Sequence, residues 1–329
     1  MKNKLILASI FAVTLLFTQP QAARAQQPYV TDDEVKVNMY KKFVDNRVPN
    51  PVAAYQAARD YMSRYGKEDD QYTKYLKAWI AAYEEDERNR RLAAEKADRE
   101  QQLLGSFTTK DYAKSYGLAK QVLADTPDNL RVLIALGYGG VAASTEGRTE
   151  AYNADAAKYA AKAIQLIGSG KTPDTWAPFK GKDDVLGSLH YALGFYALKT
   201  NPEAAIQSFI TATQVDADRR NAPSTYYYLA ASYQTGPYKK LSEDYSKRFA
   251  NQPESPESKA ALDNINKVVD KMIDAYARAV AFAGTSPQNQ TAKGQWMAQL
   301  TNFWKFRHEN SDAGLNEYIA GVLKTPLPQ

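Results

Sequence analysis

Short helical segments separated by prolines are the feature that most restricts the fold of this chain. From Gly105 onward, segments rich in Ala, Leu and Tyr alternate with breaks that contain proline. No sustained run of alternating β-branched residues, which a strand would require, occurs in the sequence. Because isolated helices of about 12–15 residues are marginal in water, these helices must bury their apolar faces on one another. The sequence therefore predicts an all-α protein.

Three of the helical segments share one design. A large residue precedes a leucine by three positions, and Gly or Ala follows the leucine, as in LIALGYGGVAAS (133–144), HYALGFYALKT (190–200) and YYYLAASYQTG (226–236). The resulting anchors are Leu136-Gly137, Leu193-Gly194 and Leu229-Ala230. A small residue at this position allows a partner helix to approach closely.

A second type of helix alternates with the first. It places small and large residues at four-then-three spacing, which puts them on one helical face. The spaced sets are Ser115/Ala119/Val122, Ala156/Ala160/Ala163, Ala205/Phe209/Ala212 and Met272/Tyr276/Ala279.

The pairing of these two helix types resembles the tetratricopeptide repeat. That repeat is a helix pair of about 34 residues with Leu-Gly on its first helix, Ala-x3-Phe on its second and a closing proline. Gly194 and Ala230 are 36 residues apart, whereas Gly137 and Gly194 are 57 apart, which implies an insertion of about 23 residues. The resemblance covers roughly residues 106–306 and implies a right-handed helical solenoid with a concave face.

The region before Gly105 is expected to be helical as well. Helices are predicted at 35–47, at 51–65 and, as one long helix, at roughly 70–104. The second half of the long helix, EEDERNRRLAAEKADREQQ, has almost no apolar residues and carries acid–base pairs four positions apart. Such a helix either bridges two regions through solvent or forms a docking surface or coiled coil.

The pattern divides the chain into four parts. A leader at 1–25 precedes an N-terminal helical region at 26–104, TPR-like repeats at 105–306 and a C-terminal capping segment at 307–329. Two insertions rich in Gly, Pro, Ser and Lys, at 168–183 and 235–258, are expected to be loops.

The N-terminus has the three parts of a bacterial secretory signal peptide. Lys2 and Lys4 precede an apolar run at 5–17, and Ala23-Arg24-Ala25 offers small residues two positions apart. We expect cleavage after Ala25 and a periplasmic or secreted protein. Loss of the three leader cations would lower the formal net charge from +5 to +2, so the basic pI does not indicate nucleic-acid binding. The apolar run is too short to span a membrane, and we expect no span in the mature chain.

Residues that usually carry chemistry are few. The chain has no Cys, and its two histidines, His190 and His308, do not form a ligand pair. Acidic pairs such as Asp69-Asp70 and Asp183-Asp184 stand at predicted helix starts, where carboxylates cap free N–H groups. We therefore expect no metal, no cofactor and no enzymatic activity.

The segment GKT at 170–172 matches the end of a phosphate-binding P-loop. Gln165 occupies the position of the motif's first glycine, the preceding residues form a helix rather than a strand, and Pro173 follows directly. We expect no nucleotide here, but a helix that ends at Ile167 with Gly168 as its left-handed cap.

By the tetratricopeptide resemblance, the first helix of each pair lines the concave groove. The residues that it places there are Arg131, Tyr138, Tyr191, Phe195, Tyr227 and Gln234. Exposed Tyr, Phe and Arg side chains favour binding interfaces, although the same rings could instead be core packing between helices. The sequence predicts a non-catalytic scaffold that binds a protein or peptide. Alternatives are a glycan-binding helical-repeat protein, similar in broad class to SusD, and an all-α glycosidase.

Overall fold

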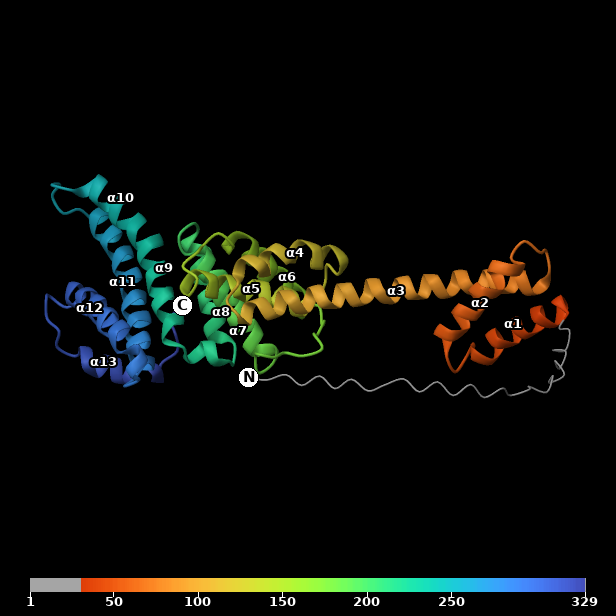
Figure 1. Ribbon diagram of the computed structural model, residues 1–329. Coiled ribbons are helices and arrows are strands. Elements are labelled where there is room, and N and C mark those ends of the chain that lie inside the picture. The colour runs from red at the N-terminus through yellow and green to blue at the C-terminus, as the bar shows by residue number, and fades with distance from the viewer. Residues whose placement is uncertain (1–30, 329) are drawn as a thin grey trace, which may run out of the picture. The chain divides into compact units, whose positions relative to one another are not determined.

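Helices are the regular secondary structure of the residues that the computed structural model of this protein describes, 31–328 (Figure 1). The expected leader at 1–25 lies outside this range. No strand occurs among the described residues. The chain divides into two compact units, which meet between Arg91 and Leu92, inside helix α3 (Gln71–Thr108). The sequence pattern placed its own boundary later, after residue 104.

The first unit consists of α1 (Asp32–Asn46), α2 (Pro51–Tyr65) and the first part of α3. Helix α2 has the predicted bounds because its signals are local: the Asn50 side chain accepts a hydrogen bond from the Ala53 N–H, and Pro51 occupies the first turn. Helix α1 begins three residues earlier than predicted, because Thr31 and Glu34 form a capping box.

The core of the first unit is aromatic and alanine-rich. Phe43, Ala54, Ala58, Tyr61 and Leu76 are completely buried. The small alanines of α2 let α1 approach closely, and α1 and α2 pack along one another. The charged stretch of α3 behaves differently, since nearly all residues from 84 to 98 are exposed.

The second unit contains the rest of α3 and ten further α-helices. These are α4 (Tyr112–Asp125), α5 (Leu130–Thr145), α6 (Asn153–Gly168), α7 (Lys182–Ala197), α8 (Pro202–Gln214), α9 (Pro223–Tyr233), α10 (Lys239–Phe249), α11 (Pro256–Ala283), α12 (Gln290–Arg307) and α13 (Leu315–Gly321).

The helices of the second unit pack in chain order. From α4 to α9 each helix contacts the next, and α9 packs on α11, which in turn carries α12 and α13. Helix α5 also contacts α7, and α7 contacts α9, so alternate helices are neighbours as well. This arrangement follows from the two predicted helix types, because each has an apolar face for both neighbours.

The four predicted small-and-large stripes are all buried, which confirms their assignment as packing faces. The small residues of the first helix type have the predicted role as well. Gly137 lies against Ala160, and Gly194 lies against the ring of Phe209.

The second predicted insertion is mostly helical rather than a loop. Gln234–Tyr238 forms a π-helical turn that leads directly into α10. Pro237 lies within this turn, where its missing N–H interrupts the regular α-helical hydrogen bonding. The prediction of a loop over all of 235–258 was therefore wrong.

The first predicted insertion is irregular from Ser169 to Gly181, but its cap differs from the prediction. Gly168 is the last residue of α6, and Gly170 is the left-handed glycine, with φ at 90°. The Lys171 N–H donates to Leu166 O and the Gly170 N–H to Ile167 O, so the GKT segment ends a helix. The Lys171 ammonium pairs with Asp128 at 2.6 Å.

Candidate functional site

A cavity of about 820 Å³ lies between the C-terminal part of α3, helix α5 and the loop at 169–181. Its lining is mainly aromatic and aliphatic, with a few polar groups. The main side chains are Glu100, Gln101, Leu104, Phe107, Tyr112, Arg131, Ile134, Tyr138, Trp176 and Phe179.

Helix α5 provides one wall because its residues at helical spacing share a face. Arg131, Ala135, Tyr138 and Ala142 line the cavity, while residues on the other face are in the core. Asn129 positions the start of this helix. Its side chain accepts from the Val132 N–H at 3.2 Å and donates to Glu100 Oε2 of α3 at 2.7 Å.

The loop provides the opposite wall through two half-buried rings, Trp176 and Phe179. The ring of Phe179 meets that of Tyr138 edge-on, with centroids 5.7 Å apart and an interplanar angle of 80°. The far end of the loop is held in place, because the Lys180 N–H donates to the carboxylate of Asp184 at 3.0 Å. The rings are therefore presented on a loop fixed at both ends.

Arg219 holds the side chain of Tyr138 in place. Its guanidinium donates to the Tyr138 hydroxyl and lies 5.3 Å from the centroid of that ring. It also lies 4.2 Å from the ring centroid of Tyr191, so one cation holds two tyrosines by cation–π contact. Arg219 is not predictable from the sequence, since no local pattern in the short helix Asp218–Asn221 signals a contact 81 residues away.

The lining carries one acid and one cation, Glu100 and Arg131. Glu100 accepts the hydrogen bond from Asn129. Arg131 is exposed and forms no ion pair or side-chain hydrogen bond with any residue in the described range 31–328. The cavity thus offers a cation to a carbonyl or carboxylate ligand, next to aromatic walls.

Of the six residues predicted to line a groove, Arg131 and Tyr138 line this cavity together. Tyr191 is only 4% exposed and packs edge-on against Phe209, which favours the core alternative for this residue. Phe195 is half-buried and packs against Tyr228 at 5.4 Å.

The remaining two predicted residues pack against α11 and α12. Tyr227 stacks on Trp296 with centroids 5.4 Å apart. Gln234 accepts a hydrogen bond from the hydroxyl of Tyr276 at 2.9 Å. Neither residue lines the cavity at α5.

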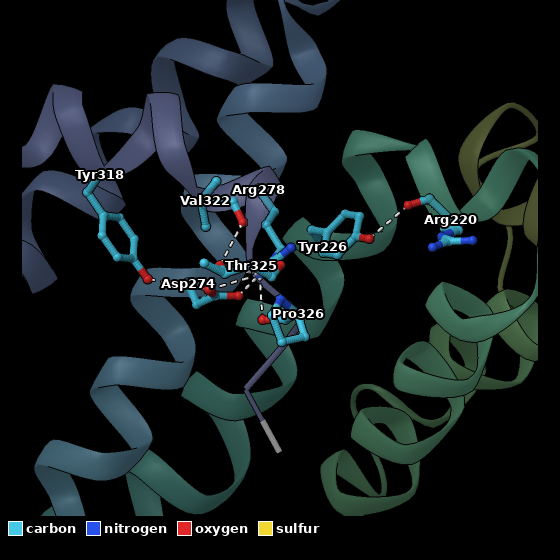
Figure 2. Close-up of polar contacts among 8 residues, drawn as sticks. All are labelled: Arg220, Tyr226, Asp274, Arg278, Tyr318, Val322, Thr325 and Pro326. Carbon is cyan, nitrogen blue, oxygen red and sulfur yellow. Dashed lines mark hydrogen bonds and ion pairs between the residues drawn. The ribbon is translucent and has the colours of Figure 1, made fainter.

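A second cavity, of about 1040 Å³, lies between α8, α9, α11 and the C-terminal residues 323–328. Beside it lies a buried ion pair, in which Arg278 Nε donates to Asp274 Oδ1 at 2.6 Å (Figure 2). Burial raises the pKa of the Asp274 carboxyl, while the hydrogen bonds from Arg278 and Tyr318 act in the opposite direction. These are the two buried charged side chains among the described residues.

No group of three His, Asp or Glu side chains that could hold a metal ion occurs within residues 31–328. The buried carboxylate Asp274 faces an arginine rather than a second acid, so these residues contain no buried acidic pair of the glycosidase type. None of the described helices combines the length and the apolar character that crossing a membrane requires.

Comparisons of this chain with protein-family models, with curated proteins and with solved structures find no match. The class that the geometry itself defines is an all-helical protein with an aromatic-walled, cation-bearing cavity.

Proposed function

We propose that this chain is an exported, non-catalytic scaffold with a TPR-like right-handed solenoid. The chain-order packing from α4 to α9 and the contacts between alternate helices support a solenoid, because each helix pair stacks on the next. The signal-peptide pattern of residues 1–25 supports export to the periplasm or beyond the cell.

The partner is an extended segment of another protein, which binds in the cavity between α3, α5 and the loop. The observation that carries this proposal is the free Arg131 cation beside the rings of Tyr138, Trp176 and Phe179. The volume of the α5 cavity lies in the range of pockets that bury a compact ligand, equivalent to a few peptide residues. Arg131 would bind a carboxylate or backbone carbonyl of that segment.

Ring geometry favours a peptide over a glycan. Sugar rings bind on open aromatic faces, whereas Tyr138 and Phe179 are nearly perpendicular, with the edge of one ring against the face of the other. A mixed lining of Arg131, Gln101 and Tyr138 instead offers donors and acceptors of the kind that a peptide backbone uses.

Site-specific photo-crosslinking tests the proposal in cells that express the chain natively. The crosslinker replaces Thr175, an exposed residue of the cavity rim, and the control position is Lys158, exposed on α6 outside the lining. We expect one envelope protein to be captured from position 175 and not from 158. Capture should be lost when Arg131→Glu is added, since the cation binds the partner.

Capture that is unchanged by Arg131→Glu, or capture that is equal from both positions, would contradict the proposal. Binding of purified chain to a glycan array, lost in the Trp176→Ala variant, would replace the peptide partner by a glycan.

A further inference from the structure

The C-terminal residues 325–328 run as an extended segment along the second cavity. The last short helix ends at Lys324, and no helix or turn follows it within the described residues. Figure 2 shows this segment beside Arg278 of α11, with Tyr226 of α9 close by.

Backbone carbonyls hold the segment in place. Arg278 Nη2 donates to Thr325 O and to Pro326 O, each at 2.9 Å, while Nε of the same guanidinium donates to Asp274 (Figure 2). The carboxylate of Asp274 already balances the charge of Arg278 without the segment. Arg278 therefore binds the carbonyls of Thr325 and Pro326 in addition to its complete ion pair with Asp274, as it would bind the carbonyls of a ligand.

Side chains contribute little to this attachment. Thr325, Pro326 and Pro328 are exposed, and only Leu327 packs partly against the main hydrophobic cluster. One half-buried leucine and the hydrogen bonds from Arg278, to the two carbonyls and at 3.4 Å to Thr325 Oγ1, hold the segment at this site. Attachment of this kind can dissociate without unfolding the helices beneath it.

The chemistry of the segment matches its site. Pro326 and Pro328 have no N–H, so the accessible backbone groups of the segment are mainly carbonyl acceptors. A site for such a segment must supply donors, and Arg278 does so. Prolines also hold the chain extended before binding, which lowers the entropy cost of recognition.

The groove is larger than the segment requires. A cavity of about 1040 Å³ remains beside the segment, walled by Tyr226, which stacks on Phe282 at 5.2 Å, and by Ile206 and Ile210 of α8. Lys271 and Arg220 add cations to its edge. Aromatic walls next to donors are typical of sites that bind proline-containing segments.

We propose that the groove between α8, α9 and α11 is a docking site for an extended, proline-containing segment of a protein partner, with residues 325–328 as its internal pseudo-ligand. The partner segment displaces these residues and presents consecutive carbonyls to Arg278. The site is separate from the cavity at α5, so it does not depend on the function proposed for that cavity.

The test uses a fluorescent peptide with the sequence of residues 322–328, VLKTPLP. Its binding is measured by anisotropy to the full chain and to a chain that ends at Lys324. We expect the shortened chain to bind the peptide about tenfold more tightly, because a tethered segment competes at high effective concentration. A matched peptide with alanine in place of both prolines should bind markedly more weakly to both chains.

A double variant tests the role of the buried pair. Asp274→Asn with Arg278→Met removes the donor at position 278 without leaving an isolated buried charge, and peptide binding should be lost. The matched control is Asp270→Asn with Arg307→Met, an exposed pair that joins α11 to α12 at 2.7 Å. This control should bind the peptide normally.

A second measurement applies to the intact chain even if shortening prevents folding. The sequence has no Cys, so Pro328→Cys allows a single dye to be attached beside the site. Saturating VLKTPLP should increase the rotational mobility of this dye. An unchanged dye signal, or a folded shortened chain that does not distinguish the two peptides, would overturn the proposal.

A dimer that disappears on shortening would also overturn it, because the occupant would then be a second copy of the chain. Light scattering of the full and shortened chains measures this outcome. Failure of the α5 cavity to bind a partner would leave each of these results unaffected.

Discussion

Gly137 of α5 lies directly against the backbone of Ala160 of α6. A Cβ atom at Gly137 would be 2.8 Å from both the N and the Cα of Ala160, closer than real Cβ contacts occur. The helices therefore approach as closely as they do only because this position is glycine. Gly194 lies close to a side chain of α8 instead, where a Cβ would be 2.8 Å from Cζ of the Phe209 ring.

The Gly137→Ala substitution should destabilise the chain by about 1–3 kcal/mol, because the neighbouring backbone must shift to admit the methyl group. The matched control is Gly117→Ala in α4, where nothing lies within 4 Å of the added Cβ. This control should stabilise the chain by about 0.5–1 kcal/mol through helix propensity. Urea unfolding followed by circular dichroism measures both free energies of unfolding. Equal effects of the two substitutions would disprove the close-packing argument.

The hydroxyl of Tyr196 on α7 donates to Gly137 O at 2.8 Å, and burial raises the pKa of this tyrosine. Tyr196→Phe should lower the free energy of unfolding by about 1 kcal/mol, the contribution of one hydrogen bond. The comparison is Tyr152→Phe, whose hydroxyl has no hydrogen-bond partner among the residues that the structure describes. Thermal unfolding should show a lower midpoint for Tyr196→Phe and little change for Tyr152→Phe; the reverse order would count against this hydrogen bond.

The stability of the chain should fall more when one partner of the buried pair of Asp274 and Arg278 is lost than when both are replaced. Arg278→Met leaves a buried carboxylate without its partner and should cost about 3–5 kcal/mol, whereas combining it with Asp274→Leu should recover part of that loss. Arg307→Met breaks an exposed pair and should cost no more than about 1 kcal/mol. Denaturant unfolding of the three variants tests this order. A double variant less stable than Arg278→Met would refute the explanation.

Acid should lower the stability of the first unit because the carboxylate of Asp70 becomes protonated. This carboxylate accepts hydrogen bonds from Lys36 and from the Thr73 N–H at 2.7 Å, and these lower its pKa from 3.8 to about 2. Since the folded state holds the ionised form more strongly, the stabilisation is complete above about pH 4 and is lost as the pH falls towards 2. Asp70→Asn, which keeps the helix cap, should make thermal stability less dependent on pH in this interval.

The control for this pH effect is Asp69→Asn, which removes the neighbouring exposed carboxylate that pairs with Lys74. Melting curves recorded from pH 5 to pH 2 give the dependence for each variant. Equal flattening in both variants would show that Asp70 has no special role.

The sequence determined the helices and their packing faces because both depend on short-range patterns. Helix α2 has its predicted bounds since Asn50 and Pro51 act within one turn. The stripe of Ala205, Phe209 and Ala212 is buried because helical periodicity alone places these residues on one face. Arg131 and Tyr138, which the tetratricopeptide resemblance predicted to line a groove, both line the α5 cavity.

Tertiary packing decided what local composition could not. Gly236 and Pro237 looked like loop residues, but the turn that contains them packs on α8, where a Cβ at Gly236 would lie 2.7 Å from Cβ of Pro202. A glycine that allows close packing and a glycine that makes a turn flexible are identical in sequence. Only the neighbouring helix distinguishes them.

The contacts at the two cavities also depend on tertiary packing rather than on local sequence. Arg219 reaches Tyr138 across 81 residues, and Arg278 reaches Thr325 across 47. Periodicity specifies which face of a helix is apolar, but it does not specify which distant side chain will meet that face. Those contacts depend on how the helices stack, so the sequence by itself determined an all-helical chain with paired packing faces, and only the tertiary structure brought the cation, the rings and the C-terminal carbonyls together.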